Sequence, residues 1–96
     1  RADAYAARCM VLDAARKRDD GRDVGVEASC AKMFASEAVG RIADRNVQVH
    51  GGNGYIREYR AEQLYRDARL FRIYEGTTQI QQIIIARNMV RAARAA

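Results

Sequence analysis

Two helical patterns meet in one stretch of this chain, which reads Arg66-Asp67-Ala68-Arg69-Leu70-Phe71-Arg72-Ile73-Tyr74-Glu75-Gly76-Thr77-Thr78-Gln79-Ile80-Gln81. The first pattern ends in a turn that carries a single carboxylate, Glu75, followed by a glycine. Two threonines then open the second pattern, where Thr78 and Gln81 have the spacing of a capping box. The stretch therefore predicts an acid beside the unpaired backbone amides of a helix start.

The rest of the sequence predicts an all-α fold, arranged as an antiparallel and incomplete helical bundle. Apolar residues recur at helical spacing in four segments, which are 2 to about 18, 26 to about 49, 61 to 69, and from about 78 onward. Gly21 suits the left-handed position after the first helix, and Asp23 is a candidate N-cap for the second. Three glycines in Gly51-Gly52-Asn53-Gly54 predict a loop. The first two helices are long enough to form a hairpin.

Composition limits the classes of function. A chain of 96 residues makes one domain at most, with a modest core. The net charge is +5, but acids and bases alternate, so the sequence predicts no nucleic-acid surface. One histidine and two separated cysteines are too few for a zinc site, so no metal is expected. No apolar run is long enough for a membrane span, and we expect a reducing compartment.

Two interpretations of Glu75 follow from its neighbours. Ile73 and Tyr74 precede it, and desolvation by such groups makes a carboxylate a better general base near neutral pH. The backbone amides of Thr77, Thr78 and Gln79 are available to an anion or to polar cofactor atoms. In the structural alternative, Thr78 is only a cap and Glu75 only a partner of the helix dipole.

The glycine loop is also open to two interpretations. It is either a simple turn between helices or a set of amides that a pyrophosphate can approach. The loop lacks the GxGxxG spacing and no strand precedes it, which excludes a Rossmann fold. His50, beside the loop, would ordinarily be a structural hydrogen-bonding residue.

From about Ala31 to Arg87 the sequence resembles the C-terminal helical domain of the acyl-CoA dehydrogenases. The matching stretches are Ala31-Lys32-Met33-Phe34-Ala35-Ser36-Glu37-Ala38, Val47-Gln48-Val49-His50-Gly51-Gly52-Asn53-Gly54-Tyr55, Leu64-Tyr65-Arg66-Asp67-Ala68-Arg69 and Ile73-Tyr74-Glu75-Gly76-Thr77. Arg60 departs from the pattern, because the family usually has a proline there. This difference should affect only the entry to the short third helix.

The resemblance implies a role for each matching residue. Glu75 would remove the α-proton of an acyl-CoA thioester, and its N–H would bind the thioester carbonyl. The β-hydrogen would leave as hydride to FAD, giving a trans-2-enoyl-CoA. Tyr74 and Gly76 would line the substrate channel. The residues implied in FAD binding are Thr77, Thr78 and Gln79, together with Gln48, Val49, His50, Gly51 and Gly52, which would contact the FAD of a neighbouring subunit.

The same resemblance implies the setting of the domain. Residues 1–96 would be the C-terminal domain of a longer enzyme, whose N-terminal helical and middle β domains are not in this sequence. Its partners would be an acyl-CoA substrate, an electron-transferring flavoprotein and further subunits in a dimer or tetramer. The compartment would be the bacterial cytoplasm, or the mitochondrial matrix in a eukaryote. The alternatives are a catalytically silent helical packing module and an acyl-CoA oxidase.

Overall fold

The computed structural model describes all residues 1–96 and contains helices but no strands. The α-helices are α1 (Ala2–Asp19), α2 (Gly25–His50), α3 (Ala61–Leu70) and α4 (Thr78–Ala95), and a short 3-10 helix, η1 (Gly51–Gly54), follows α2. The predicted all-α class is confirmed, and each predicted helical segment becomes one helix. None of these helices combines the length and the apolar character that crossing a bilayer requires.

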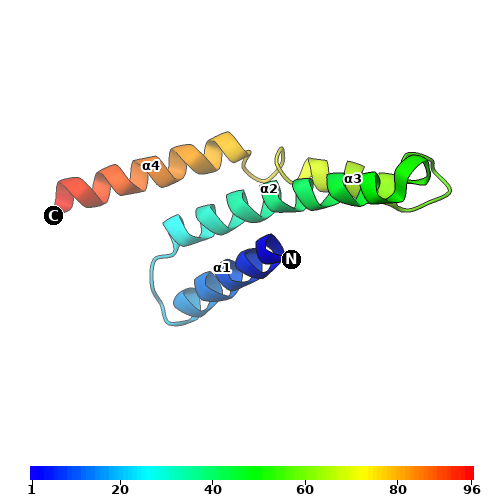
Figure 1. The fold of residues 1–96 in the computed structure, drawn as a ribbon. Helices are drawn as coiled ribbons and strands as arrows, with labels where there is room; N and C mark the ends of the chain where they lie inside the picture. Colours follow the sequence, from blue (N-terminus) through cyan, green and yellow to red (C-terminus); the bar gives the residue numbers. More distant parts are fainter.

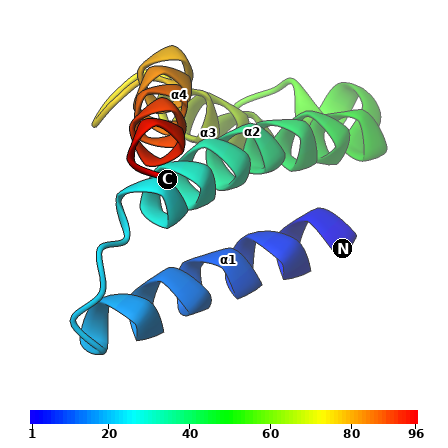
Figure 2. The same ribbon diagram turned by 90° about the vertical axis from the view of Figure 1, so that its left-hand side faces the viewer.

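Helix α2 is the centre of the arrangement. The other three α-helices each pack against α2, and no comparable contact joins any two of them. Figure 1 shows α3 and α4 following one another along α2, and Figure 2 shows α1 beside α2 in the predicted antiparallel hairpin. The radius of gyration is 16.4 Å, whereas a compact chain of this length has about 12.5 Å. The bundle is therefore open rather than closed.

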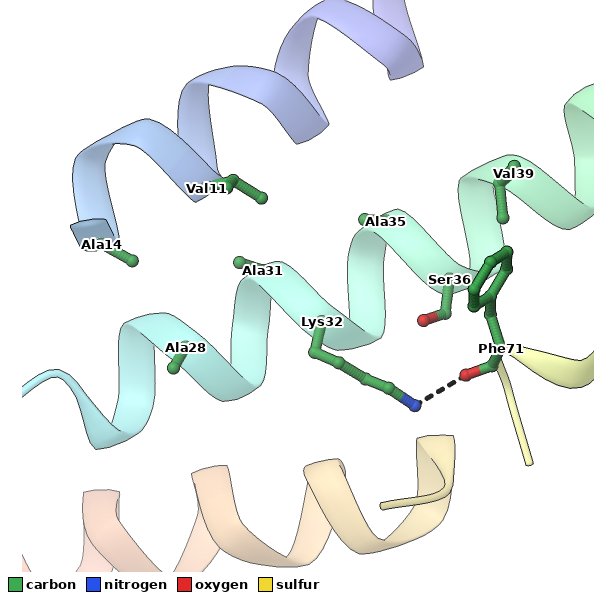
Figure 3. A pocket seen from close by; sticks show the side chains of 9 residues that line it. All are labelled: Val11, Ala14, Ala28, Ala31, Lys32, Ala35, Ser36, Val39 and Phe71. Carbon is green, nitrogen blue, oxygen red and sulfur yellow. Dashed lines mark hydrogen bonds between the residues drawn. The ribbon is translucent and has the colours of Figure 1, made fainter. Parts of the chain in front are cut away.

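Small residues make up the buried interior. The buried apolar residues are Ala14, Val24, Ala31, Ala38, Ala43, Ala61 and Ala68, and no large side chain is fully buried. Figure 3 shows Val11 and Ala14 of α1 facing alanines of α2 across a groove of about 550 Å³. Large apolar side chains lie outside this interior, among them Ile80, Ile83 and Val90 on α4. Because small side chains bury little area, this interior contributes little hydrophobic stabilisation.

The end of α1 confirms the role predicted for Gly21. Its φ is 76°, in the left-handed region. The N–H of Gly21 donates to the carbonyl of Arg18 (2.9 Å), and the N–H of Arg22 donates to the carbonyl of Lys17 (3.0 Å). These two bonds form a Schellman motif, which satisfies carbonyls that the helix end would otherwise leave free.

The start of α2 lies one residue away from the prediction. Val24, not Asp23, is the N-cap, and no side chain caps the helix at that position. The Asp23 carboxylate instead accepts a hydrogen bond from the N–H of Gly25 at 3.0 Å. Asp23 therefore still satisfies one amide of the first turn, from the residue before the cap.

The glycine segment predicted as a loop is a short 3-10 helix. The prediction was wrong because a single turn with i→i+3 bonds does not require the propensity of a longer helix. Gly54 is buried, and a Cβ there would collide with the carbonyl oxygen of Val47 and lie 3.0 Å from the Cβ of His50. Close packing onto the end of α2 therefore explains this glycine.

An ion pair between residues on successive turns of α3 stabilises this helix. The side chain of Arg66 donates to the carboxylate of Glu62 at 2.7 Å, four residues earlier. This hydrogen bond from Arg66 lowers the pKa of the Glu62 carboxyl and raises the pKa of Arg66. The arrangement is the favourable i,i+4 pair of an exposed helix face.

The cap of α4 also differs from the predicted capping box. The N-cap is Thr77, whose hydroxyl accepts from the N–H of Ile80 at 3.1 Å. Thr78 is buried, and its hydroxyl donates instead to the carboxylate of Glu37 on α2 at 2.8 Å. The Thr78 hydroxyl, which the local spacing predicted as the cap, therefore binds Glu37 of α2 instead.

We predict that Gly54→Ala lowers the free energy of unfolding by about 1–3 kcal/mol, the usual cost of overpacking. The added Cβ would meet the Val47 carbonyl and push η1 away from α2. Urea unfolding followed by circular dichroism measures the effect. Gly52→Ala is the matched control, because nothing lies within 4 Å of a Cβ built there. Equal midpoints for the two variants would contradict the packing argument.

We also predict that Thr77→Ala lowers the free energy of unfolding by about 1 kcal/mol, because the first turn of α4 loses its side-chain acceptor. Thr77→Ser should keep wild-type stability, since serine caps a helix through the same oxygen. Thermal melts of the two variants make the comparison. A neutral Thr77→Ala would show that the cap bond at Ile80 contributes nothing.

Candidate active site

The turn that carries Glu75 begins by winding back onto the end of α3. The amides of Ile73 and Tyr74 both donate to the carbonyl of Leu70, at 2.9 and 3.2 Å. Two consecutive left-handed residues follow, with φ values of 52° at Glu75 and 86° at Gly76. No other non-glycine residue in the chain has a positive φ. Because a Cβ disfavours this conformation, contacts with the rest of the chain must hold the turn.

Three of these contacts come from Lys32 on α2. Its ammonium donates to the carbonyls of Phe71 (2.7 Å), Tyr74 (3.2 Å) and Gly76 (2.5 Å). Figure 3 shows the side chain reaching from α2 to the Phe71 carbonyl. Lys32 is not among the site residues predicted from the sequence. The available signal was a lysine on a wide alanine-rich face, with no acid one turn before or after it.

Several amides of the turn and of the α4 start have no hydrogen-bond partner. The N–H groups of Glu75, Gly76, Thr77 and Gln79 donate to no atom of the chain. Thr77 and Gln79 thus match the prediction of available amides. The prediction was wrong for Thr78, whose N–H donates to the carbonyl of Arg72 at 3.2 Å. The turn therefore presents a run of donors, beginning at the backbone of Glu75 itself.

The side chain of Glu75 is exposed in this chain. The expected desolvation by Ile73 and Tyr74 is absent, because both of these neighbours are themselves exposed. Adjacent residues in a tight turn point in different directions, so apolar neighbours in sequence do not enclose the carboxylate. A surface outside these 96 residues would have to cover it.

The two predicted substrate residues lie on either side of Glu75. The ring of Tyr74 pairs with that of Phe71, with centroids 5.7 Å apart. Gly76 is half-buried, and a Cβ there would collide with the side-chain amide of Gln81, which donates to the Gly76 carbonyl at 3.4 Å. The left-handed backbone conformation therefore favours glycine at position 76, whereas the side chain of Gln81 could move aside.

A second network ties the start of α4 to α2. The Glu37 carboxylate accepts from the hydroxyl of Thr78 and pairs with the guanidinium of Arg72, whose Nη1 lies 3.4 Å away. The guanidinium lies over Gly40, where a Cβ would be 3.5 Å from Nε. This distance is an ordinary van der Waals contact, so the guanidinium packs on the helix at Gly40 without requiring a glycine there.

The predicted cofactor residues of α4 share one polar hollow with this network. The hollow has a volume of about 170 Å³, and its lining residues are Glu37, Arg69, Arg72, Ile73, Thr77, Thr78 and Gln79. The three predicted residues at the α4 start are thus brought together beside an arginine and a carboxylate.

The other predicted cofactor segment lies elsewhere. Gln48, Val49 and His50 form the last turn of α2, and all three are exposed, as are Gly51 and Gly52. Gln48 lies eleven residues beyond Glu37 along α2, which corresponds to about 16 Å. The structure therefore does not bring the two cofactor segments together within this chain.

The end of α2 has a defined geometry. Nδ1 of His50 lies 2.8 Å from the carbonyl oxygen of Asn46. A carbonyl oxygen can only accept, so Nδ1 is the donor of this hydrogen bond. No hydrogen bond of Nε2 within the chain accompanies it. The structural role predicted for His50 is thus present. Gly51 has a φ of 64°, and no atom lies within 4 Å of a Cβ built on Gly51 or Gly52.

Comparison with known families matches residues 1–90 to the acyl-CoA dehydrogenase C-terminal domain. Over 86 residues, the chain is 48% identical to a 3-(aryl)acrylate reductase from Clostridium sporogenes. It is 46% identical over the same length to subunit CarC of the caffeyl-CoA reductase-Etf complex from Acetobacterium woodii. Butyryl-CoA dehydrogenase from Megasphaera elsdenii is similar in structure, with a TM-score of 0.89 and 36% identity.

These matches cover most of this chain but little of each relative. The alignments with the two reductases take in 90% of this chain and 23% of each relative. The butyryl-CoA dehydrogenase match takes in 92% of this chain and 23% of that one. The chain thus spans less than a quarter of the length of these proteins. Sequence and fold agree over the same residues, and the chain belongs to the acyl-CoA dehydrogenase family, within its C-terminal domain.

Proposed function

We propose that this chain is the C-terminal domain of a larger FAD-dependent acyl-CoA dehydrogenase and that Glu75 is its catalytic base. One observation carries the assignment. An exposed carboxylate stands on a left-handed turn, and its own N–H is unpaired. A base and a hydrogen-bond donor that belong to one residue can act on neighbouring atoms of one substrate.

The chemistry follows from this pairing. The thioester carbonyl accepts a hydrogen bond from the Glu75 N–H, which stabilises the negative charge that develops on the carbonyl oxygen. The Glu75 carboxylate takes the α-proton, and the C–H electron pair forms the new α,β double bond as the β-hydrogen leaves with its own pair. The product is a trans-2-enoyl-CoA. A bound flavin supplies the acceptor for that hydride.

The residues present fit a flavin at two separate places. At the α4 start, Thr77 and Gln79 line the polar hollow described above, and their amides are free to bind polar cofactor atoms. At the α2 end, Gly51 and Gly52 leave open space in front of the backbone, so that a bulky group can approach it closely. We propose that these two places contact different flavins, one of them in a neighbouring subunit.

Further partners follow from the same proposal. The family relationship to a subunit of a reductase-Etf complex supports an electron-transferring flavoprotein as the electron acceptor. The exposed isoleucines of α4 support association with further subunits in a dimer or tetramer. Cys9 and Cys30 are free thiols, which fits the bacterial cytoplasm or a mitochondrial matrix.

The central test is Glu75→Gln in the complete flavoprotein. Glutamine keeps the size and the backbone N–H but cannot accept the proton, so we expect the rate to fall by about 10²–10⁴-fold. The measurement is bleaching of the flavin on anaerobic mixing with saturated acyl-CoA thioesters. Acyl-CoA binding should change little.

The control for this test is Glu58→Gln, which removes an exposed glutamate from the loop before α3. It should bleach at the wild-type rate. Wild-type bleaching by Glu75→Gln would exclude Glu75 as the base and favour a silent packing module. Rapid reoxidation of the reduced wild-type enzyme by oxygen would instead indicate an acyl-CoA oxidase.

We also expect the 96-residue chain by itself to bind FAD weakly. Its two candidate flavin segments lie at different positions along α2 and would each supply only one edge of a site. Titration of the purified chain into FAD, followed by flavin fluorescence, measures the affinity. Tight binding of one FAD per chain would contradict a site completed by other domains.

A further inference from the structure

All the hydrogen bonds of the Lys32 side chain go to the segment that carries Glu75. An ammonium has three N–H donors, and the carbonyls of Phe71, Tyr74 and Gly76 are three acceptors. No carboxylate lies within ion-pair distance of Lys32, whereas the other lysine, Lys17, pairs with Asp13 and Glu27. The ammonium of Lys32 is therefore bound by backbone carbonyls and by no salt bridge.

The positions of these carbonyls determine where the neighbouring amides point. Every peptide bond of the chain is trans, and a trans peptide directs its C=O and N–H to opposite sides. The carbonyl of Tyr74 belongs to the same peptide as the N–H of Glu75, and the carbonyl of Gly76 to that of Thr77. Because both carbonyls face Lys32, both amides point away from Lys32. These are two of the amides that lack a partner in the chain.

Helix capping accounts for only part of this arrangement. The Phe71 carbonyl lies at the end of α3, where a cation is favourable beside any helix. The Tyr74 and Gly76 carbonyls lie beyond the helix and on both sides of Glu75. Lys32 therefore holds the left-handed turn from the α2 side, at the peptide before Glu75 and at the peptide between Gly76 and Thr77.

A cation bound to a carbonyl also changes the opposite side of the peptide. It draws electron density toward the oxygen, and hydrogen bonds in a chain polarise one another in this way. The N–H of Glu75 becomes a stronger donor as a result. That amide is the group that binds the thioester carbonyl in the function proposed above.

We propose that Lys32 is a positioning residue, which orients the Glu75 amide and strengthens it as the donor to the thioester carbonyl. The inference rests on the proposed function. Lys32 itself would not contact the substrate. Its ammonium lies on the α2 side of the turn, whereas the free amides of Glu75 and Thr77 lie on the opposite side.

Two variants of the complete flavoprotein test the proposal. Lys32→Met removes the charge and all three donors, while Lys32→Gln keeps a neutral N–H donor near the carbonyls. Because the Glu75 donor is weakened rather than lost, the limiting rate of flavin bleaching should fall about 10- to 100-fold, less than the roughly 10²–10³-fold cost of removing an oxyanion donor. Lys17→Met is the matched control and should keep the wild-type rate.

A spectroscopic measurement separates polarisation from simple loss of structure. An enoyl-CoA labelled with ¹³C at its thioester carbonyl reports the strength of the hydrogen bond to that oxygen. Its resonance should move toward the free-ligand position in both Lys32 variants and stay at the wild-type position in Lys17→Met. If Lys32→Met fails to fold, the resonance in Lys32→Gln can still be compared with the resonance in the wild-type protein and in Lys17→Met.

The outcomes are distinct. A wild-type carbonyl resonance in folded Lys32→Gln would overturn the role of the charge, even if the rate falls. A wild-type rate in both variants would overturn the inference as a whole and leave the role of Glu75 intact. If the wild-type protein itself does not bleach with any acyl-CoA, the proposed function is wrong and the inference fails with it.

Discussion

Packing on a single helix determines the rest of this structure. Every other helix packs against α2, and none of them makes a comparable contact with another. Lys32 and Glu37 lie little more than one turn apart on α2. Lys32 binds the turn on both sides of Glu75, and Glu37 binds Thr78 at the start of α4 and Arg72 before it. The geometry of the candidate active site is therefore set by two charged side chains of a helix that is distant in sequence.

These polar contacts matter because the apolar interior is slight. Alanines and serines make up most of the buried interior, but they bury little area, and the large apolar side chains remain at the surface. The isoleucines exposed on α4 form an apolar surface of the kind that marks an interaction site. Glu75 is exposed as well. The family relationship is consistent with this picture, since the chain spans less than a quarter of its relatives.

Local sequence signals predicted the elements well and their ends less well. The left-handed Gly21 and the four helical segments followed from turn chemistry and apolar spacing. The cap of α4 did not, because Thr77 and Thr78 are adjacent hydroxyl residues and local spacing cannot tell which is drawn toward Glu37. The 3-10 turn at the glycine segment was missed for a similar reason. Close packing of Gly54 on the end of α2 stabilises it, and no local propensity reveals such a contact.

The helical class and, through linked motifs, the family and the candidate base could be predicted from the amino-acid sequence. Those features depend on residue type and spacing along the chain, which a sequence records directly. Only the tertiary structure revealed Lys32, because its acceptors are backbone carbonyls some forty residues away, and a carbonyl has no residue type to signal it. The exposure of Glu75 was likewise decided in three dimensions. A carboxylate is desolvated by the surfaces that pack around it, and its neighbours along this chain do not enclose it.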